Sequence, residues 1–251
     1  MTIPFLSEAK AVIDVDQFSK IYDNTLAVDS LSFHVDQGQI VGLVGPNGAG
    51  KTTTLRTLAG ILRPSQGTLK IGGHDIVHNP LEAKRLFALI PDEPNLFEAL
   101  TVWEHLRFIA SAYRLNGFEE AGEELLRLFD LQEKRNFLAK ELSRGMRQKV
   151  AICCAYLYEP KVLLFDEPLT ALDPRGIRTI KDSILAKAQE GTTIIISSHL
   201  LSLIEDLCTH ILIMHKGQRR YFGSVETARS EFAQETKNTS LEEIFFHVTQ
   251  S

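Results

Sequence analysis

The sequence predicts an α/β fold with a mostly parallel sheet, an N-terminal antiparallel β-subdomain and an inserted α-helical subdomain. Two observations favour this class. Short apolar runs alternate with segments of helical periodicity along most of the chain, which is the pattern of strands joined by crossover helices. Three of these runs, residues 40–44, 162–165 and 193–196, are almost continuous in Ile, Val, Leu and Phe. Strands covered by helices on both faces have this composition, so we expect the three runs to form the centre of the sheet.

The flanking segments have other patterns. Residues 12–15 and 31–35 alternate apolar and polar side chains, which predicts half-buried antiparallel strands of a smaller sheet. From about residue 101 to residue 158 no strand pattern appears, and apolar residues recur at helical spacing. We therefore expect a helical subdomain inserted into the core.

After residue 199 the pattern is that of a helix followed by two more strands, residues 211–214 and 219–222. These limits predict one domain. Its core subdomains cover about residues 1–92 and 159–251, and its helical subdomain covers about residues 93–158.

Length and composition are those of a folded domain. The chain has 251 residues, of which 44% are hydrophobic and 24% are charged. A chain of this size buries about 70 to 75% of the surface that its unfolded form exposes, so it needs neither disulfides nor a structural metal. Cys153, Cys154 and Cys208 match neither a disulfide framework nor a C-x-x-C motif, and we expect unpaired, buried thiols.

Charge and hydropathy exclude further classes. The chain has 27 basic and 32 acidic residues, a net charge of −5, and no run of five or more like charges, which argues against a nucleic-acid partner. The first ten residues lack the basic start and apolar stretch of a signal peptide, and no window approaches 18 consecutive apolar residues. We expect a cytoplasmic protein with no membrane span of its own.

The pattern G-P-N-G-A-G-K-T at residues 45–52 is a phosphate-binding loop, or P-loop, between a buried strand and a helical segment. Its glycines let backbone N–H groups turn inward, where they and the helix N-terminus hold polyphosphate oxygens. Lys51 supplies positive charge to the β- and γ-phosphates, and Thr52 offers its hydroxyl to Mg²⁺. The motif predicts a P-loop NTPase core whose nucleotide-binding residues are Gly45, Pro46, Asn47, Gly48, Ala49, Gly50, Lys51, Thr52 and Thr53.

A second motif, V-L-L-F-D-E-P at residues 162–168, ends a buried strand in two carboxylates. Ligands bind at the carboxyl ends of strands in open α/β sheets. Asp166 is placed to bind Mg²⁺ through its water shell. Glu167 is placed to polarise a water for attack on the γ-phosphate.

Between these motifs lies L-S-R-G-M-R-Q-K, residues 142–149, and here the chain resembles the ATP-binding subunit of an ABC transporter over nearly all of its length. The family's signature peptide is L-S-G-G-Q, of which L-S-R-G-M retains Ser143 and Gly145. Ser143 stands where a helix N-cap belongs, and Gly145 lets the backbone approach a phosphate closely. The resemblance implies a head-to-tail dimer in which each of two ATP molecules lies between one subunit's P-loop and the other's signature.

The resemblance also implies roles for four other residues. Tyr22 is similar to the aromatic residue that stacks on adenine, and Asp173, in A-L-D-P at residues 171–174, to a contact across the dimer interface. His199 resembles the histidine that hydrogen-bonds the γ-phosphate and orients Glu167. Relatives carry glutamine, which touches Mg²⁺ and senses the transmembrane partner, where this chain has Asp92. An aspartate remains an oxygen ligand, but it is shorter and cannot donate a hydrogen bond, so we expect weak metal contact and altered coupling.

The function implied is ATP hydrolysis that powers a separate transmembrane permease, with the chain peripheral on the inner face of the cell membrane. The second ATPase subunit is a second copy or a homologous chain. Residues 241–246 are similar to a C-terminal helix of bacterial ATPases that pair with exporter-type permeases, which favours export over import.

Two alternatives differ in class. One is a soluble ABC-type ATPase that serves an assembly or nucleic-acid process without a permease. The 91 residues between Lys51 and Ser143 leave no room for a long coiled coil, and the chain holds one ATPase unit, so the common forms of this class are disfavoured. The other alternative is a nucleotide-binding regulator that does not hydrolyse its nucleotide. The presence of Glu167 and His199 disfavours it.

Overall fold

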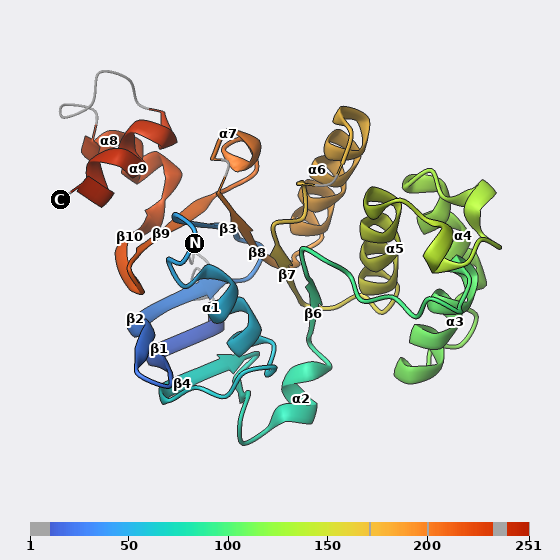
Figure 1. Ribbon diagram of the computed structural model, residues 1–251, viewed down its shortest axis with the longest axis horizontal. Coiled ribbons are helices and arrows are strands. Elements are labelled where there is room, and N and C mark those ends of the chain that lie inside the picture. Colours follow the sequence, from blue (N-terminus) through green and yellow to red (C-terminus); the bar gives the residue numbers. More distant parts are fainter. Residues whose placement is uncertain (1–10, 171, 200, 233–239, 251) are drawn as a thin grey trace, which may run out of the picture.

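Figure 1 shows the computed structural model, which describes residues 11–170, 172–199, 201–232 and 240–250. The predicted class is confirmed. Within these residues, a four-stranded antiparallel sheet lies beside a mostly parallel six-stranded sheet. Helices α3 (Val102–Tyr113), α4 (Glu119–Leu128) and α5 (Arg144–Tyr156) stand at one end of the long axis, and the C-terminal helices stand at the other.

The six-stranded sheet has the order β10-β9-β3-β8-β7-β6. Its strands are β3 (Ile40–Val44), β6 (Phe87–Ile90), β7 (Val162–Asp166), β8 (Thr193–Ser198), β9 (His210–His215) and β10 (Gln218–Ser224). All neighbours pair in parallel except β10, which is antiparallel to β9. Every residue of β3, β7 and β8 is buried, so the three predicted central runs are confirmed.

The antiparallel sheet has the order β2-β1-β4-β5. Strands β1 (Ala11–Tyr22) and β2 (Thr25–Asp36) contain the predicted segments but are longer, and several register shifts interrupt their pairing. The sequence pattern did not predict β4 (Gln66–Ile71), β5 (His74–Asp75) and β6. The first half of β4 is exposed, and β5 and β6 are too short to display a period.

As the sequence predicts, the segment between β6 and β7 is helical in the described residues. One isolated β-bridge joins Thr101 and Leu138. Its elements are α3 (Val102–Tyr113), α4 (Glu119–Leu128), α5 (Arg144–Tyr156) and the 3-10 turns Gln132–Lys134 and Ala139–Glu141. Helix α5 packs against β6 and α3, so buried residues of the helices and of the large sheet share one hydrophobic cluster. The boundaries at about residues 92 and 159 stay predictions.

The other helices are α1 (Lys51–Leu58), α2 (Pro80–Lys84), α6 (Pro174–Gln189), α7 (Leu201–Ile204), α8 (Val225–Phe232) and α9 (Leu241–Gln250). Helix α9 is anchored by Leu241 and Ile244, which are 1% and 0% exposed. In the described part of the chain, no helix has the length and apolar character needed to cross a membrane.

The cysteine prediction is confirmed in its main point. All three thiols are free, with Cys153 and Cys208 buried and Cys154 half-buried. Burial raises the pKa of Cys154 and of Cys208 to about 12, so both thiols stay protonated at neutral pH.

Two leucines of α4 test the core assignment, because Leu126 is 0% exposed and Leu128 is 48% exposed. Leu126→Ala is expected to lower the free energy of unfolding by about 2 to 5 kcal/mol, since it leaves a cavity. Leu128→Ala is expected to lower it by less than about 1 kcal/mol. Urea unfolding followed by circular dichroism measures both, and equal losses would contradict the placement of Leu126.

Candidate active site

The P-loop connects the end of β3 to the start of α1, in the order that the motif requires. Gly48 and Gly50 have φ of 81° and 103°, a left-handed region that disfavours any side chain with a Cβ. A Cβ on Gly45 would collide with the carbonyl oxygen of Met214 and lie 2.9 Å from the Cβ of Ala49. Helix α1 has no side-chain cap, so its first N–H groups are open to a ligand.

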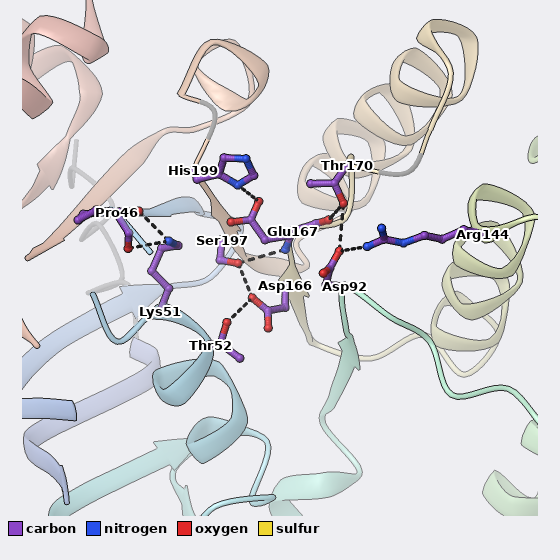
Figure 2. Close-up of polar contacts among 11 residues, drawn as sticks. Pro46, Lys51, Thr52, Asp92, Arg144, Asp166, Glu167, Thr170, Ser197 and His199 are labelled. Atoms are coloured by element: carbon purple, nitrogen blue, oxygen red, sulfur yellow. Dashed lines mark hydrogen bonds and ion pairs between the residues drawn. The ribbon is translucent and has the colours of Figure 1, made fainter. Parts of the chain in front are cut away.

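Lys51 lies buried at the start of α1, and its ammonium folds back onto the loop (Figure 2). Nζ donates to the carbonyl oxygen of Gly45 at 2.6 Å and to that of Pro46 at 3.3 Å. Burial lowers the pKa of Lys51, while the carboxylates of Glu167 and Asp166 act in the opposite direction. The P-loop thus holds the partly desolvated ammonium group of Lys51. Phosphate oxygens can replace the two carbonyl groups as its hydrogen-bond partners.

Asp166 ends β7 and is 5% exposed. Its Oδ1 accepts hydrogen bonds from Ser197 Oγ at 2.7 Å and from Thr52 Oγ1 at 3.1 Å. Mg²⁺ usually binds one or two protein oxygens, several waters and substrate phosphates, so Thr52 and Asp166 together fit this ion. The described residues contain no cluster of three or more His, Cys, Asp or Glu side chains that would suit a metal held by protein alone.

Glu167 follows Asp166 with φ of 50°, a backbone conformation that costs about 1 to 3 kcal/mol for a residue with a side chain. Its amide donates to the carbonyl oxygen of Ser197 at 3.3 Å and to Ser197 Oγ at 3.1 Å. Oε2 lies 2.9 Å from Nδ1 of His199 (Figure 2). This turn separates the two carboxylates, so that Asp166 contacts Thr52 while Glu167 contacts His199.

Asp92 lies beyond the end of β6, on the side of α5 (Figure 2). Its Oδ1 accepts from Arg144 Nη2 at 2.8 Å and from Thr170 Oγ1 at 3.0 Å. The side chains of Arg144 and Asp92 are 52% and 41% exposed. The geometry therefore gives Asp92 a guanidinium and a hydroxyl as partners, and its weak contact with Mg²⁺ stays a prediction.

Ser143 is the N-cap of α5, as predicted, because its Oγ accepts from the amide of Met146 at 3.3 Å. Asp173 caps α6, with its Oδ1 accepting from the amide of Gly176 at 2.8 Å. Ala171, in the same predicted interface loop as Asp173, lies outside the described residues. Tyr22 ends β1 and is 40% exposed.

The structure brings Lys51, Thr52, Asp166, Glu167 and His199 to the carboxyl edge of the large sheet (Figure 2). Ser143, Gly145, Asp173 and Tyr22 lie on other elements. The roles of these two sets toward ATP and a second subunit stay predictions.

Sequence reasoning missed three polar residues that support the site: Ser197, Thr170 and Arg144. Only Ser197 left a signal, because a hydroxyl at the end of a buried apolar strand needs a polar partner.

Comparison with known proteins finds matches to one family. The model of the ABC transporter family matches residues 28–170. The ABC-type transporter ATP-binding protein EcsA of Bacillus subtilis is 32% identical over 242 residues, which cover 96% of this chain and 97% of EcsA. The Nod factor export ATP-binding protein I of Burkholderia thailandensis is 35% identical over 86% of this chain and 72% of that protein. A solved ATP binding subunit of an ABC transporter is 34% identical, with a TM-score of 0.89 over 94% of this chain and 99% of that one.

Gly45→Ala tests the loop geometry. The added methyl group has to displace the loop or the Met214 carbonyl, so the variant is expected to bind a fluorescent ATP analogue at least about tenfold more weakly, the factor that 1.4 kcal/mol corresponds to. Gly73→Ala is the control, because its φ is also positive, at 82°, but its Cβ meets nothing within 4 Å. That control is expected to bind the analogue normally. Normal binding by Gly45→Ala would show that the loop tolerates the extra volume.

Proposed function

The chain belongs to the ABC transporter family as an ATP-binding subunit and ATPase, and on this premise we propose that it powers export through a separate transmembrane permease. In this proposal it works as a head-to-tail dimer with two sandwiched ATP molecules. One observation carries the hydrolytic part of the proposal: Glu167 and His199 are in contact beside Lys51, Thr52 and Asp166 at one edge of the sheet.

The geometry supports the following roles in hydrolysis. The P-loop amides and Lys51 bind the β- and γ-phosphates, with the ammonium leaving the carbonyls of Gly45 and Pro46. Thr52 and Asp166 would hold Mg²⁺, which neutralises developing phosphate charge when bound. Glu167 accepts a proton from the attacking water, a contribution of about 10² to 10⁴ in rate. His199, 2.9 Å from Glu167, keeps the carboxylate aimed and is the candidate γ-phosphate contact.

The dimer is supported by the position of the signature residues. Ser143 is exposed and Gly145 is half-buried at the start of α5, and the hydrogen bonds of the described residues do not join them to their own P-loop. An exposed helix N-terminus favours anionic groups, here the triphosphate of a second subunit. That subunit is a second copy or a homologous ATPase.

A groove of about 340 Å³ supports docking of the permease and a peripheral place at the inner face of the membrane. It lies between the sheet and the helical subdomain, and its lining includes Pro91, Leu96, Phe97, Phe108 and Tyr113. Phe97 and Phe108 are 55% and 49% exposed and pack edge to face with ring centroids 5.2 Å apart. Apolar side chains this exposed suit an apolar segment of a membrane protein.

Export is supported by the C-terminal helix and by a relative. Helix α9 is docked through Leu241 and Ile244, in the segment that resembles exporter-associated ATPases. The Burkholderia relative is an export protein by its name. The assignment to export would be overturned if the adjacent gene encodes a permease for a binding-protein-dependent importer. The cargo is chosen by the permease.

Glu167→Gln tests the hydrolytic site. The variant is expected to bind ATP, to lose turnover and to accumulate as a closed dimer, because the amide cannot accept the water's proton. ATPase assays and size-exclusion chromatography with ATP and Mg²⁺ measure these outcomes. Undiminished hydrolysis would remove Glu167 from the mechanism.

Phe108→Ala tests permease docking. In native cells the share of the subunit in the membrane fraction is expected to fall, while the ATPase rate of the purified subunit stays within about twofold of wild type, as for a surface substitution. Phe246→Ala is the matched control, because Phe246 is 55% exposed but lies on α9. An unchanged membrane-bound share for Phe108→Ala would exclude this groove as the dock.

A further inference from the structure

We infer that Arg144, Asp92 and Thr170 form a hydrogen-bond relay that positions Glu167, so that the seating of helix α5 on the core controls the catalytic carboxylate. Figure 2 shows this relay running from α5 through Asp92 to Thr170 and Glu167. The inference rests on the proposed function, in which Glu167 activates water. The three relay residues act through Glu167 and are positioning residues.

The relay joins segments that are distant in sequence. Asp92 follows β6, Arg144 is the first residue of α5, and Thr170 follows β7. A single oxygen, Asp92 Oδ1, accepts from Arg144 Nη2 at 2.8 Å and from Thr170 Oγ1 at 3.0 Å. Thr170 Oγ1 also lies 3.2 Å from the carbonyl oxygen of Glu167, in donor geometry.

The hydroxyl of Thr170 has one proton for these two acceptors. A carboxylate is a stronger acceptor than a peptide carbonyl, so an unpaired Asp92 would take the proton. Arg144 donates to the same oxygen of Asp92, which makes this oxygen a weaker acceptor for the hydroxyl of Thr170. The proton then becomes available to Glu167, and the position of the guanidinium determines which acceptor receives it.

The carbonyl of Glu167 matters because its backbone is in the left-handed region, with φ of 50°. Ser197 holds this residue on its amide side, through the bonds at 3.3 and 3.1 Å. Thr170 is the hydroxyl donor on its carbonyl side. If that donor turns to Asp92, the strained turn loses one of its two supports and the carboxylate is aimed less well.

Helix α5 is the element that the relay senses. Arg144 directly follows the cap Ser143, so a small shift of the helix moves the guanidinium relative to Asp92. An ion pair with side chains 52% and 41% exposed contributes little to stability, so it forms and breaks readily. Arg144 and Asp92 also stand where the family pattern has glycine and glutamine. Two departures from that pattern therefore contact each other.

The test is a double-mutant cycle on ATP turnover by the full chain. Arg144→Met is expected to lower kcat about three- to tenfold with little change in KM, the size of effect that the loss of one hydrogen bond produces. Asp92→Asn is expected to restore most of the turnover of the Arg144→Met protein, because the amide oxygen competes less for the Thr170 proton. Asp92→Asn alone is expected to lower kcat less than Arg144→Met does. Thr170→Val is expected to lower kcat whether residue 144 is arginine or methionine.

Glu123→Gln provides a matched control. Glu123 pairs with Arg135 at 2.9 Å, with side chains 36% and 40% exposed, in the same helical subdomain. Its loss is expected to leave kcat within about twofold, as for other exposed pairs. The relay would be overturned if the losses of kcat caused by Asp92→Asn and Arg144→Met multiply in the double variant without rescue. An equally large fall of kcat in Glu123→Gln would also overturn it.

Hydrogen exchange of the ligand-free protein gives a second readout. The peptide that contains Glu167 and Thr170 is expected to exchange faster in Arg144→Met and at the wild-type rate in the double variant. Identical exchange in all variants would overturn the inference. A wild-type chain without ATP turnover, or a Glu167→Gln variant that keeps it, would instead contradict the proposed function, and the exchange rates would still decide on the relay.

Discussion

Because β3, β7 and β8 pair in parallel, the residues that follow each strand meet at one edge of the sheet. The register aligns Asp166 with Ser197, and Val44 with Ser198. The P-loop, the two carboxylates and His199 therefore converge, although they come from three distant segments. All three strands are buried on both faces, which makes this register costly to change.

Burial and charge act together at this edge. Lys51 is buried, so its positive charge is poorly hydrated and is held by loop carbonyls and by the field of Asp166 and Glu167. Asp166 is buried but satisfied by two hydroxyl groups. In the proposed function, the oxygens of a bound triphosphate replace the loop carbonyls as partners of Lys51. Lys51 and Asp166 thus have internal hydrogen-bond partners in the separate subunit, and their side chains are already in place for the proposed binding of nucleotide.

The carboxylate of Glu167, the proposed general base, depends on a backbone that other elements must hold. Ser197 on β8 and Thr170 beyond β7 contact the two sides of Glu167. Through Asp92, Thr170 is connected to Arg144 and hence to α5. Helix α5 also packs on β6 and α3, next to the groove that includes Phe108. In the proposed relay, contacts of this single helix link motion at the proposed permease dock to the orientation of Glu167.

The sequence by itself determined the features that are local. The P-loop, the Asp166 and Glu167 pair, the Ser143 cap and the three buried strands depend on neighbouring residues and on burial, so pattern alone identifies them. Tertiary structure decided the short strands β4 to β6 and the partners of Asp92, Thr170 and Ser197. Asp92 and Arg144 are 52 residues apart, and Ser197 and Asp166 are 31 apart. Which distant polar groups meet depends on how the strands align and how α5 packs, and no local pattern carries that information.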